Sequence, residues 1–178
     1  MDSSSDVSVL NTLITTTIDS ANGFERSAEN AKGGALEHMF TEFATERRRV
    51  VTQLQATVRT LGGEPNDDGS LKADLHRRFE DLRNAFGGGD KAVIEEVERG
   101  EDYIKGKYET ALKDGDLSPQ ARAAVEEAYQ SVKAGHDRAS ALKHAQNGDS
   151  GAMAGQYQQA MGGDQDGLNA SSAGGPAI

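Results

Sequence analysis

The chain has 178 residues, with 19 basic and 29 acidic side chains and therefore a formal net charge of −10. This acidity disfavours binding to nucleic acids or to an anionic membrane surface, because both depend on Lys and Arg. The absence of cysteine excludes disulfides, thiolate metal sites and a cysteine nucleophile, and it is typical of a reducing compartment such as the cytoplasm. No apolar run approaches the roughly 20 residues of a membrane span, and the acidic N-terminus is unlike a secretory signal.

The composition changes near residue 146. Residues 1–145 contain every Lys and Arg, whereas residues 146–178 hold eight glycines, three aspartates and one aromatic residue. So little apolar surface cannot offset the entropy lost when a chain becomes ordered. The sequence therefore predicts a folded domain over residues 1–145 and a glycine-rich, acidic, disordered tail over residues 146–178.

The first half of the domain has apolar residues at steps of three and four, the spacing of helix faces. One stripe runs from Val7 to Ala28, with Asp6 as its expected N-cap and Gly33–Gly34 as its end. A second stripe runs from Leu36 to Leu61. Gly62–Gly63 and the proline that follows predict the end of this second helix.

The second half of the domain continues this pattern. A shorter stripe from Leu71 to Phe86 begins after Ser70, its expected cap, and ends at a run of three glycines. The next helix carries its stripe from Ile94 to Ala111. Ser118–Pro119, a capping residue and the proline favoured at the first helical position, opens the last helix.

Four long helices of matched length, each with one apolar stripe, predict an all-α four-helix bundle. The short helix lies between the second and third long helices. It would allow one long crossover, as in ferritin-like bundles, but periodicity alone also permits a plain up-down-up-down order.

Each long stripe is interrupted near its middle by a polar residue, namely Thr17, Arg47, Glu101 and His136. In a bundle of matched helices these positions lie at similar heights. Because buried charges are tolerated only when they are paired, one reading is a structural polar network that sets the register of the helices. A network in which these side chains pair with one another leaves little room for catalysis.

The other reading is a metal site for iron, manganese or zinc, with Glu98, Glu101, His136 and Glu29 as the candidate ligands. Bundle di-iron centres use about four carboxylates and two histidines, with Glu-x-x-His pairs on two helices. No such pair lies on a stripe here. The charge of Arg47 also opposes a bound cation.

Four stretches resemble the DUF2383 family of four-helix-bundle proteins, in the ferritin-like superfamily. They are VSVLNTLITTTIDSANGFERSAE, RRRVVTQLQATVRTLGGEPNDDGSLKADLHRRF, EEVERGEDYIKGKYETAL and VKAGHDRASAL, and together they span about residues 7–143. The resemblance implies a bacterial, cytosolic, ferritin-like bundle with its short extra helix in the crossover between the second and third long helices. The expected function is a non-catalytic, stress-associated protein that acts as a homo-oligomer or through a protein partner. The alternative is a metal-binding bundle with ferroxidase-like or storage activity.

Overall fold

The computed structural model describes residues 3–31, 34–69, 80–113 and 115–146. Within these ranges the fold is all-α and contains no strand. The elements are α1 (Ser3–Asn30), α2 (Ala35–Thr60), the short 3₁₀ helix η1 (Phe86–Gly88), α4 (Asp90–Lys113) and α5 (Pro119–Gln146). Residues 80–85 are also helical. The contacts divide the chain into two units, Met1–Lys143 and His144–Ile178, and the description below concerns the first.

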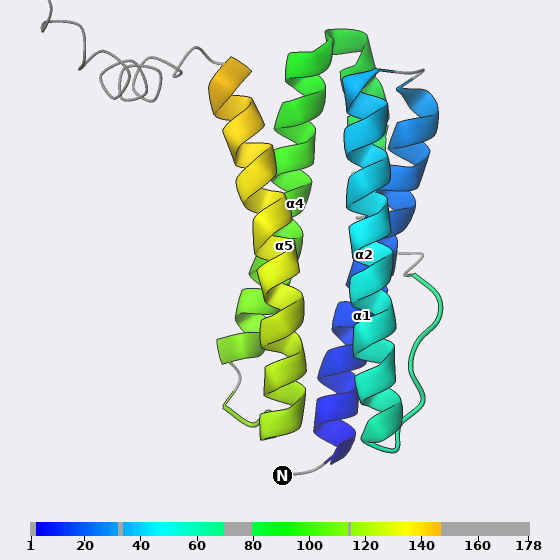
Figure 1. Cartoon of the computed structure of the whole chain (residues 1–178), viewed down its shortest axis with the longest axis vertical. Helices are drawn as coiled ribbons and strands as arrows, with labels where there is room; N and C mark the ends of the chain where they lie inside the picture. Colours follow the sequence, from blue (N-terminus) through cyan, green and yellow to red (C-terminus); the bar gives the residue numbers. More distant parts are fainter. Residues whose placement is uncertain (1–2, 32–33, 70–79, 114, 147–178) are drawn as a thin grey trace, which may run out of the picture. The chain divides into compact units, whose positions relative to one another are not determined.

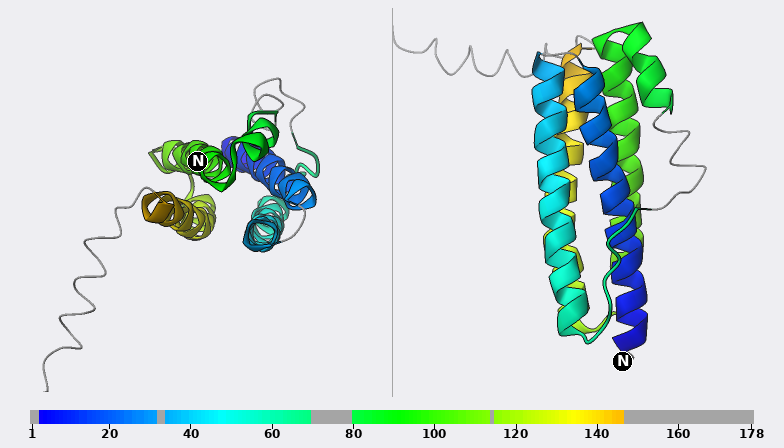
Figure 2. Two further views of the ribbon diagram at one scale, coloured as in Figure 1. Left: turned by 90° about the horizontal axis from the view of Figure 1, so that it is seen from above. Right: turned by 90° about the vertical axis from the view of Figure 1, so that its right-hand side faces the viewer.

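The long helices form a bundle (Figure 1), in which α1 and α5 run in one direction while α2 and α4 run in the other. Seen along the bundle (Figure 2), α1 lies beside α2 and α4, and α5 lies beside α2 and α4. Helices α2 and α4 therefore occupy opposite corners. Because they are parallel, the end of α2 and the start of α4 lie at opposite ends of the bundle, and residues 61–89 connect them.

The predicted helix ends are confirmed at α2 and α5. Beyond α2, the Gly62 N–H donates to Arg59 O and the Gly63 N–H to Val58 O, both at 3.0 Å. This is a Schellman cap, and it requires the positive φ of 81° at Gly62, which glycine adopts without strain. At the start of α5, the Ser118 hydroxyl accepts a hydrogen bond from the Ala121 N–H at 3.3 Å.

The expected role of Asp6 was wrong. Helix α1 begins at Ser3, so Asp6 lies within its first turn rather than at its N-cap. Its carboxylate is buried and accepts a hydrogen bond of 3.0 Å from the Ser118 N–H. A buried acid needs such a partner, and this one joins the start of α1 to the start of α5.

Residues 61–69 form a strap that climbs along α1. A side chain at Gly63 would clash with Val7, at 2.6 Å from its Cγ2. Further along, the Asn11 amide donates to Glu64 O at 2.9 Å, and the Asn66 amide donates to the Thr15 hydroxyl at 2.9 Å. These partners on α1 are four residues apart and so lie on one helix face. The strap thus begins the return between the parallel helices α2 and α4.

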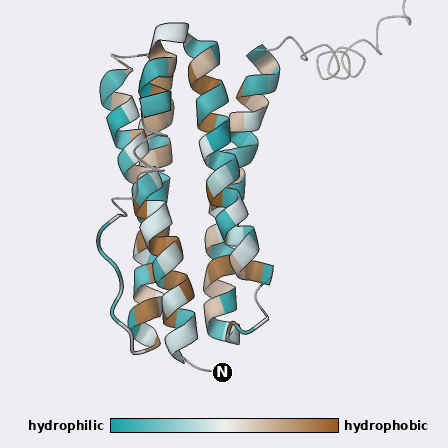
Figure 3. Cartoon of the chain, turned by 180° about the vertical axis from the view of Figure 1, so that it is seen from behind, coloured by the Kyte–Doolittle hydropathy of each residue, from teal (hydrophilic) through white to brown (hydrophobic). Residues whose placement is uncertain are grey.

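The core of the bundle consists of two apolar clusters at different heights. One draws on Leu10–Ile18, Val50–Val58, Ile104–Ala111 and Leu117–Val132. The other includes three phenylalanines and contains Phe24, Met39, Phe40, Phe43, Ala44, Leu82, Val93, Val97 and Ala139. Figure 3 shows the corresponding apolar stretches along the helices. No described helix is long and apolar enough to cross a membrane.

Several predictions fall on residues outside the described ranges. The Ser70 cap and most of the predicted short crossover helix lie within residues 70–79, and the predicted tail lies within residues 147–178 except for Gln146, which is the last residue of α5. Only the end of the short helix, residues 80–85, is described, and it is helical.

Candidate functional site

Arg47 and Glu101 meet in the middle of the bundle. They come from α2 and α4, the helices at opposite corners, and the Arg47 Nη2 donates to Glu101 Oε2 at 2.5 Å. The two side chains are 1% and 0% exposed, respectively. Two fully buried charges are tolerated only as such a pair, because each ion alone would cost several kcal/mol.

The ion pair occupies a layer between the two apolar clusters. Between their two apolar stretches, α2, α4 and α5 each contribute one buried residue, namely Arg47, Glu101 and Gly135, whereas α1 contributes Asp19, Ala21 and Gly23. A Cβ at Gly135 would lie 2.8 Å from both Arg47 Nη2 and Glu101 Oε2. The absence of a side chain at Gly135 therefore makes room for the pair.

The pair uses only part of its hydrogen-bonding capacity. Within the described residues, Arg47 Nε and Glu101 Oε1 have no hydrogen-bond partner. Burial raises the pKa of the Glu101 carboxyl, and the charge and hydrogen bond of Arg47 oppose that rise. A bidentate fork would also use Oε1, so the pair is joined by the Nη2–Oε2 bond without the second bond of a fork.

Thr17, which was grouped with this network, has a different partner. Its hydroxyl lies 2.8 Å from the Tyr108 hydroxyl and donates to Leu13 O at 2.7 Å. Burial raises the pKa of Tyr108 to about 12, while its hydrogen bond with Thr17 and the charge of Arg47 act in the opposite direction. This contact links α1 to α4 among the apolar side chains of the first cluster.

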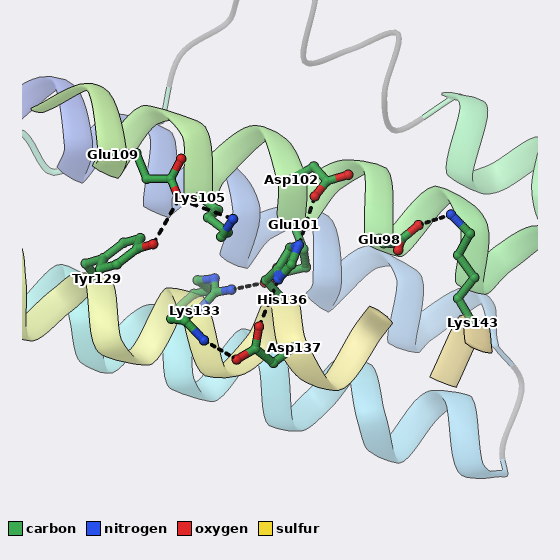
Figure 4. Close-up of polar contacts among 11 residues, drawn as sticks. Glu98, Glu101, Asp102, Lys105, Glu109, Tyr129, Lys133, His136, Asp137 and Lys143 are labelled. Carbon is green, nitrogen blue, oxygen red and sulfur yellow. Dashed lines mark hydrogen bonds and ion pairs between the residues drawn. The ribbon is translucent and has the colours of Figure 1, made fainter. Parts of the chain in front are cut away.

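His136 lies at the edge of the bundle, between α4 and α5 (Figure 4). Its Nε2 is 2.9 Å from an oxygen of Asp102, and its Nδ1 is 3.1 Å from an oxygen of Asp137. No direct hydrogen bond joins it to Arg47 or Glu101, although its charge acts on Glu101. His136 is thus one of several polar contacts between α4 and α5, which include the Glu109–Tyr129 hydrogen bond of 2.9 Å.

The candidate metal ligands are not gathered into a site. Glu98 pairs with Lys143, Glu101 with Arg47, and His136 with Asp102, while Glu29 is exposed near the end of α1. The described residues contain no group of three or more side chains suited to hold a metal ion. The donor set of a bundle di-metal centre, four carboxylates and two histidines, does not fit an arrangement in which the central carboxylate already holds a guanidinium.

A groove of about 760 Å³ opens between α2 and α5, and Arg47 and Gly135 are among the residues that line it. One wall carries charged side chains, including Glu42, whose Oε2 accepts from Arg138 Nη2 at 2.6 Å. Near the ion pair, the Ser131 hydroxyl donates to Glu46. Hydrogen bonds from Arg49 and Ser131 lower the pKa of Glu46 to about 2.

Sequence reasoning missed Gly135 and Asp102 as members of this region. A glycine within a long helix costs roughly 1 kcal/mol relative to alanine, and that cost was a usable signal for Gly135. Asp102 follows Glu101 directly, so helical periodicity places it off the apolar stripe. Nothing in the pattern identified it as the partner of His136.

Residues 5–114 match a family model described as "Domain of unknown function (DUF2383)". The matched part contains most of α1 and all of α2 and α4, and it ends before α5, which supplies Gly135 and His136. No curated protein matches the chain.

Proposed function

The chain belongs to the DUF2383 family, and from this premise we propose that it is a non-catalytic, ferritin-like bundle protein that acts by assembly or by binding a protein partner. The observation that carries the proposal is the Arg47–Glu101 pair. It joins the two charged residues at the centre of the bundle to each other, and both side chains are at most 1% exposed.

The ferritin-like part of the proposal is supported by the course of the chain. Helices α2 and α4 are parallel, and residues 61–89 connect them (Figure 1). A bundle with one such long crossover follows the connectivity of ferritin-like folds, whereas a plain up-down-up-down bundle has short loops throughout.

The non-catalytic part is supported by the charges at the bundle centre. Glu101 is fully buried in the layer between the apolar clusters, and its charge is paired with the Arg47 guanidinium. A cation brought to the same place would be repelled by Arg47. The central position thus favours a structural role, in which the pair sets the register of α2 against α4.

The test combines elemental analysis with light scattering on the purified protein. After aerobic and anaerobic loading with iron, manganese or zinc, we expect a metal-to-protein ratio near zero, together with a discrete oligomer or a stable complex with a partner. A stoichiometric metal that is lost from both Glu101→Ala and His136→Ala variants would refute the non-catalytic proposal and favour the metal-binding alternative. A strict monomer would remove self-assembly and leave partner binding.

A role in the bacterial stress response is the physiological part of this proposal, and it is supported by the family resemblance alone. In a bacterium that encodes the chain, we expect deletion of its gene to reduce survival under stress, with normal growth otherwise. Equal survival of the deletion and parent strains across oxidative, osmotic and starvation stress would contradict it.

A further inference from the structure

The groove between α2 and α5 has the dimensions and walls of a helix-binding site. Its lining on α2 extends from Gly34 to Arg47, which is about 20 Å at the rise of an α-helix. Its other wall, on α5, includes the small residues Ser131, Ala134 and Gly135. Small residues let the backbone of a neighbouring helix approach closely, and a groove between two helices is a common binding site for a third helix.

The charges along the groove favour a basic occupant. Glu37, Glu42 and Glu46 line it, whereas the charge of Arg47 is balanced by Glu101. Arg138 pairs with Glu42 and Arg49 pairs with Glu46, so Glu37 carries the acidic charge of the lining that no ion pair among the described residues balances. The net charge of −10 for the whole chain would also speed the approach of a basic partner.

The existing contacts in the groove can be exchanged for contacts with a partner. The Glu42–Arg138 pair is exposed, with side chains 44% and 49% accessible, and such exposed pairs contribute little to stability. Arg138 lies over the ring of Phe43, 5.4 Å from its centroid. Movement of Arg138 would uncover an aromatic surface for the apolar side of an incoming helix.

We propose that this groove binds a basic, amphipathic helical segment of another protein, with its lysines or arginines against Glu37 and Glu42 and its apolar side against Ala134 and Gly135. This inference rests on the proposed function as a binding protein and names the chemistry of the partner.

The experiment uses the full chain and a fluorescent helical peptide built from alanine, leucine and lysine. A peptide of the same pattern with glutamate in place of lysine, and the flexible polyamine spermine, serve as comparisons. We expect the lysine peptide to bind in an anisotropy titration, to bind more weakly at high salt, and to exceed both comparisons in affinity. Equal binding of the glutamate peptide, or displacement by spermine at the same concentration, would overturn the proposal.

Variants locate the binding site. Ala134→Arg places a large cation in the groove and should abolish binding, whereas Ala123→Arg, at another exposed position of α5, should weaken it much less. Glu37→Gln with Glu42→Gln should weaken binding about tenfold, because two exposed charge contacts are lost. The matched control is Glu29→Gln with Glu126→Gln, which removes the same charge outside the groove. Equal effects of variant and control in either comparison would overturn the assignment of the groove.

Light scattering and metal analysis on the same samples separate the two proposals. If the protein does not bind the lysine peptide but forms a discrete oligomer, the proposal of a basic partner is refuted and the proposed function still holds. If Ala134→Arg also breaks that oligomer, the groove holds a second copy of the chain and the basic-helix proposal is wrong. If the protein binds the peptide in the groove and also holds a stoichiometric metal, the groove proposal is supported and the proposal of a non-catalytic function is refuted.

Discussion

The buried pair of Arg47 and Glu101 leads to a prediction that distinguishes a structural ion pair from a catalytic or metal-binding site. We consider Arg47→Met, Glu101→Leu and the double variant. Each single change leaves one charge in the interior, where the remaining side chain is at most 1% exposed. The double change replaces both charges by apolar groups that continue the two clusters above and below.

The magnitudes follow from the cost of an unpaired buried charge. Each single variant should lose about 3–5 kcal/mol of unfolding free energy, which corresponds to a fall in Tm of about 10 °C for a chain of this size. The double variant should lie within about 2 kcal/mol of the parent protein, because replacing a whole buried pair with apolar residues is often neutral or stabilising. The cycle therefore predicts strong coupling between the two positions.

The two single variants should also differ in their response to pH. In Arg47→Met, Glu101 loses its counter-charge while burial still raises its pKa above the ordinary 4.5. For a raised pKa, the stabilising contribution is present below the unfolded value and is lost as pH rises. The defect of Arg47→Met should thus be small in acid and large at neutral pH. The defect of Glu101→Leu should persist in acid, because Arg47 does not lose its proton.

The assay is urea unfolding followed by far-UV circular dichroism, at acidic and neutral pH, for the parent and the three variants. Additive losses in the double variant would show that the two side chains do not act as a pair. Losses below about 1 kcal/mol in both single variants would show that water reaches these charges, since surface pairs contribute no more than this. Either result would refute the reasoning about the core, and with it the observation that carries the proposed function.

Three further predictions concern other parts of the bundle. Gly135→Ala should destabilise the protein, because the new Cβ would lie 2.8 Å from both charged groups of the pair. Gly106→Ala should instead stabilise α4 by about 0.5–1 kcal/mol, because a Cβ there would have no neighbouring atom within 4 Å. A gain in Tm for both variants would contradict the packing described. Burial raises the pKa of Tyr108 to about 12, so its contribution to stability is complete below its ordinary value of 10.0 and should be lost between about pH 10 and 12. Alkaline unfolding curves should show that loss in the parent and not in Tyr108→Phe. Asn66→Ala removes the hydrogen bond to Thr15 and should lower the free energy of unfolding by about 1 kcal/mol. Amide hydrogen exchange should become faster in the strap alone. Unchanged exchange in the strap would show that this contact does not hold the strap against α1.

Much of the fold followed from local signals. Gly62 ends α2 because few other residues adopt its positive φ, and Ser118 with Pro119 opens α5 because one caps the helix and the other has the required φ. The interruption of an apolar stripe at Arg47 and Glu101 likewise indicated buried charges that need partners. Such signals act over one or two helical turns, and reading them requires no knowledge of how the helices pack.

The tertiary structure decided which residues meet. Periodicity places Arg47, Glu101 and His136 at similar heights, but it does not say that α2 and α4 lie at opposite corners, where two long side chains can span the core. It also does not reveal that Gly135 faces the pair, because a glycine shows its role only through the neighbours that fill the space of its missing side chain. Asp6 shows the same limit: its local context predicts a helix cap, and only packing brings it to the start of α5. Helices are specified by neighbours in sequence, whereas partners of buried charges depend on rotation and register between helices, which the whole core determines.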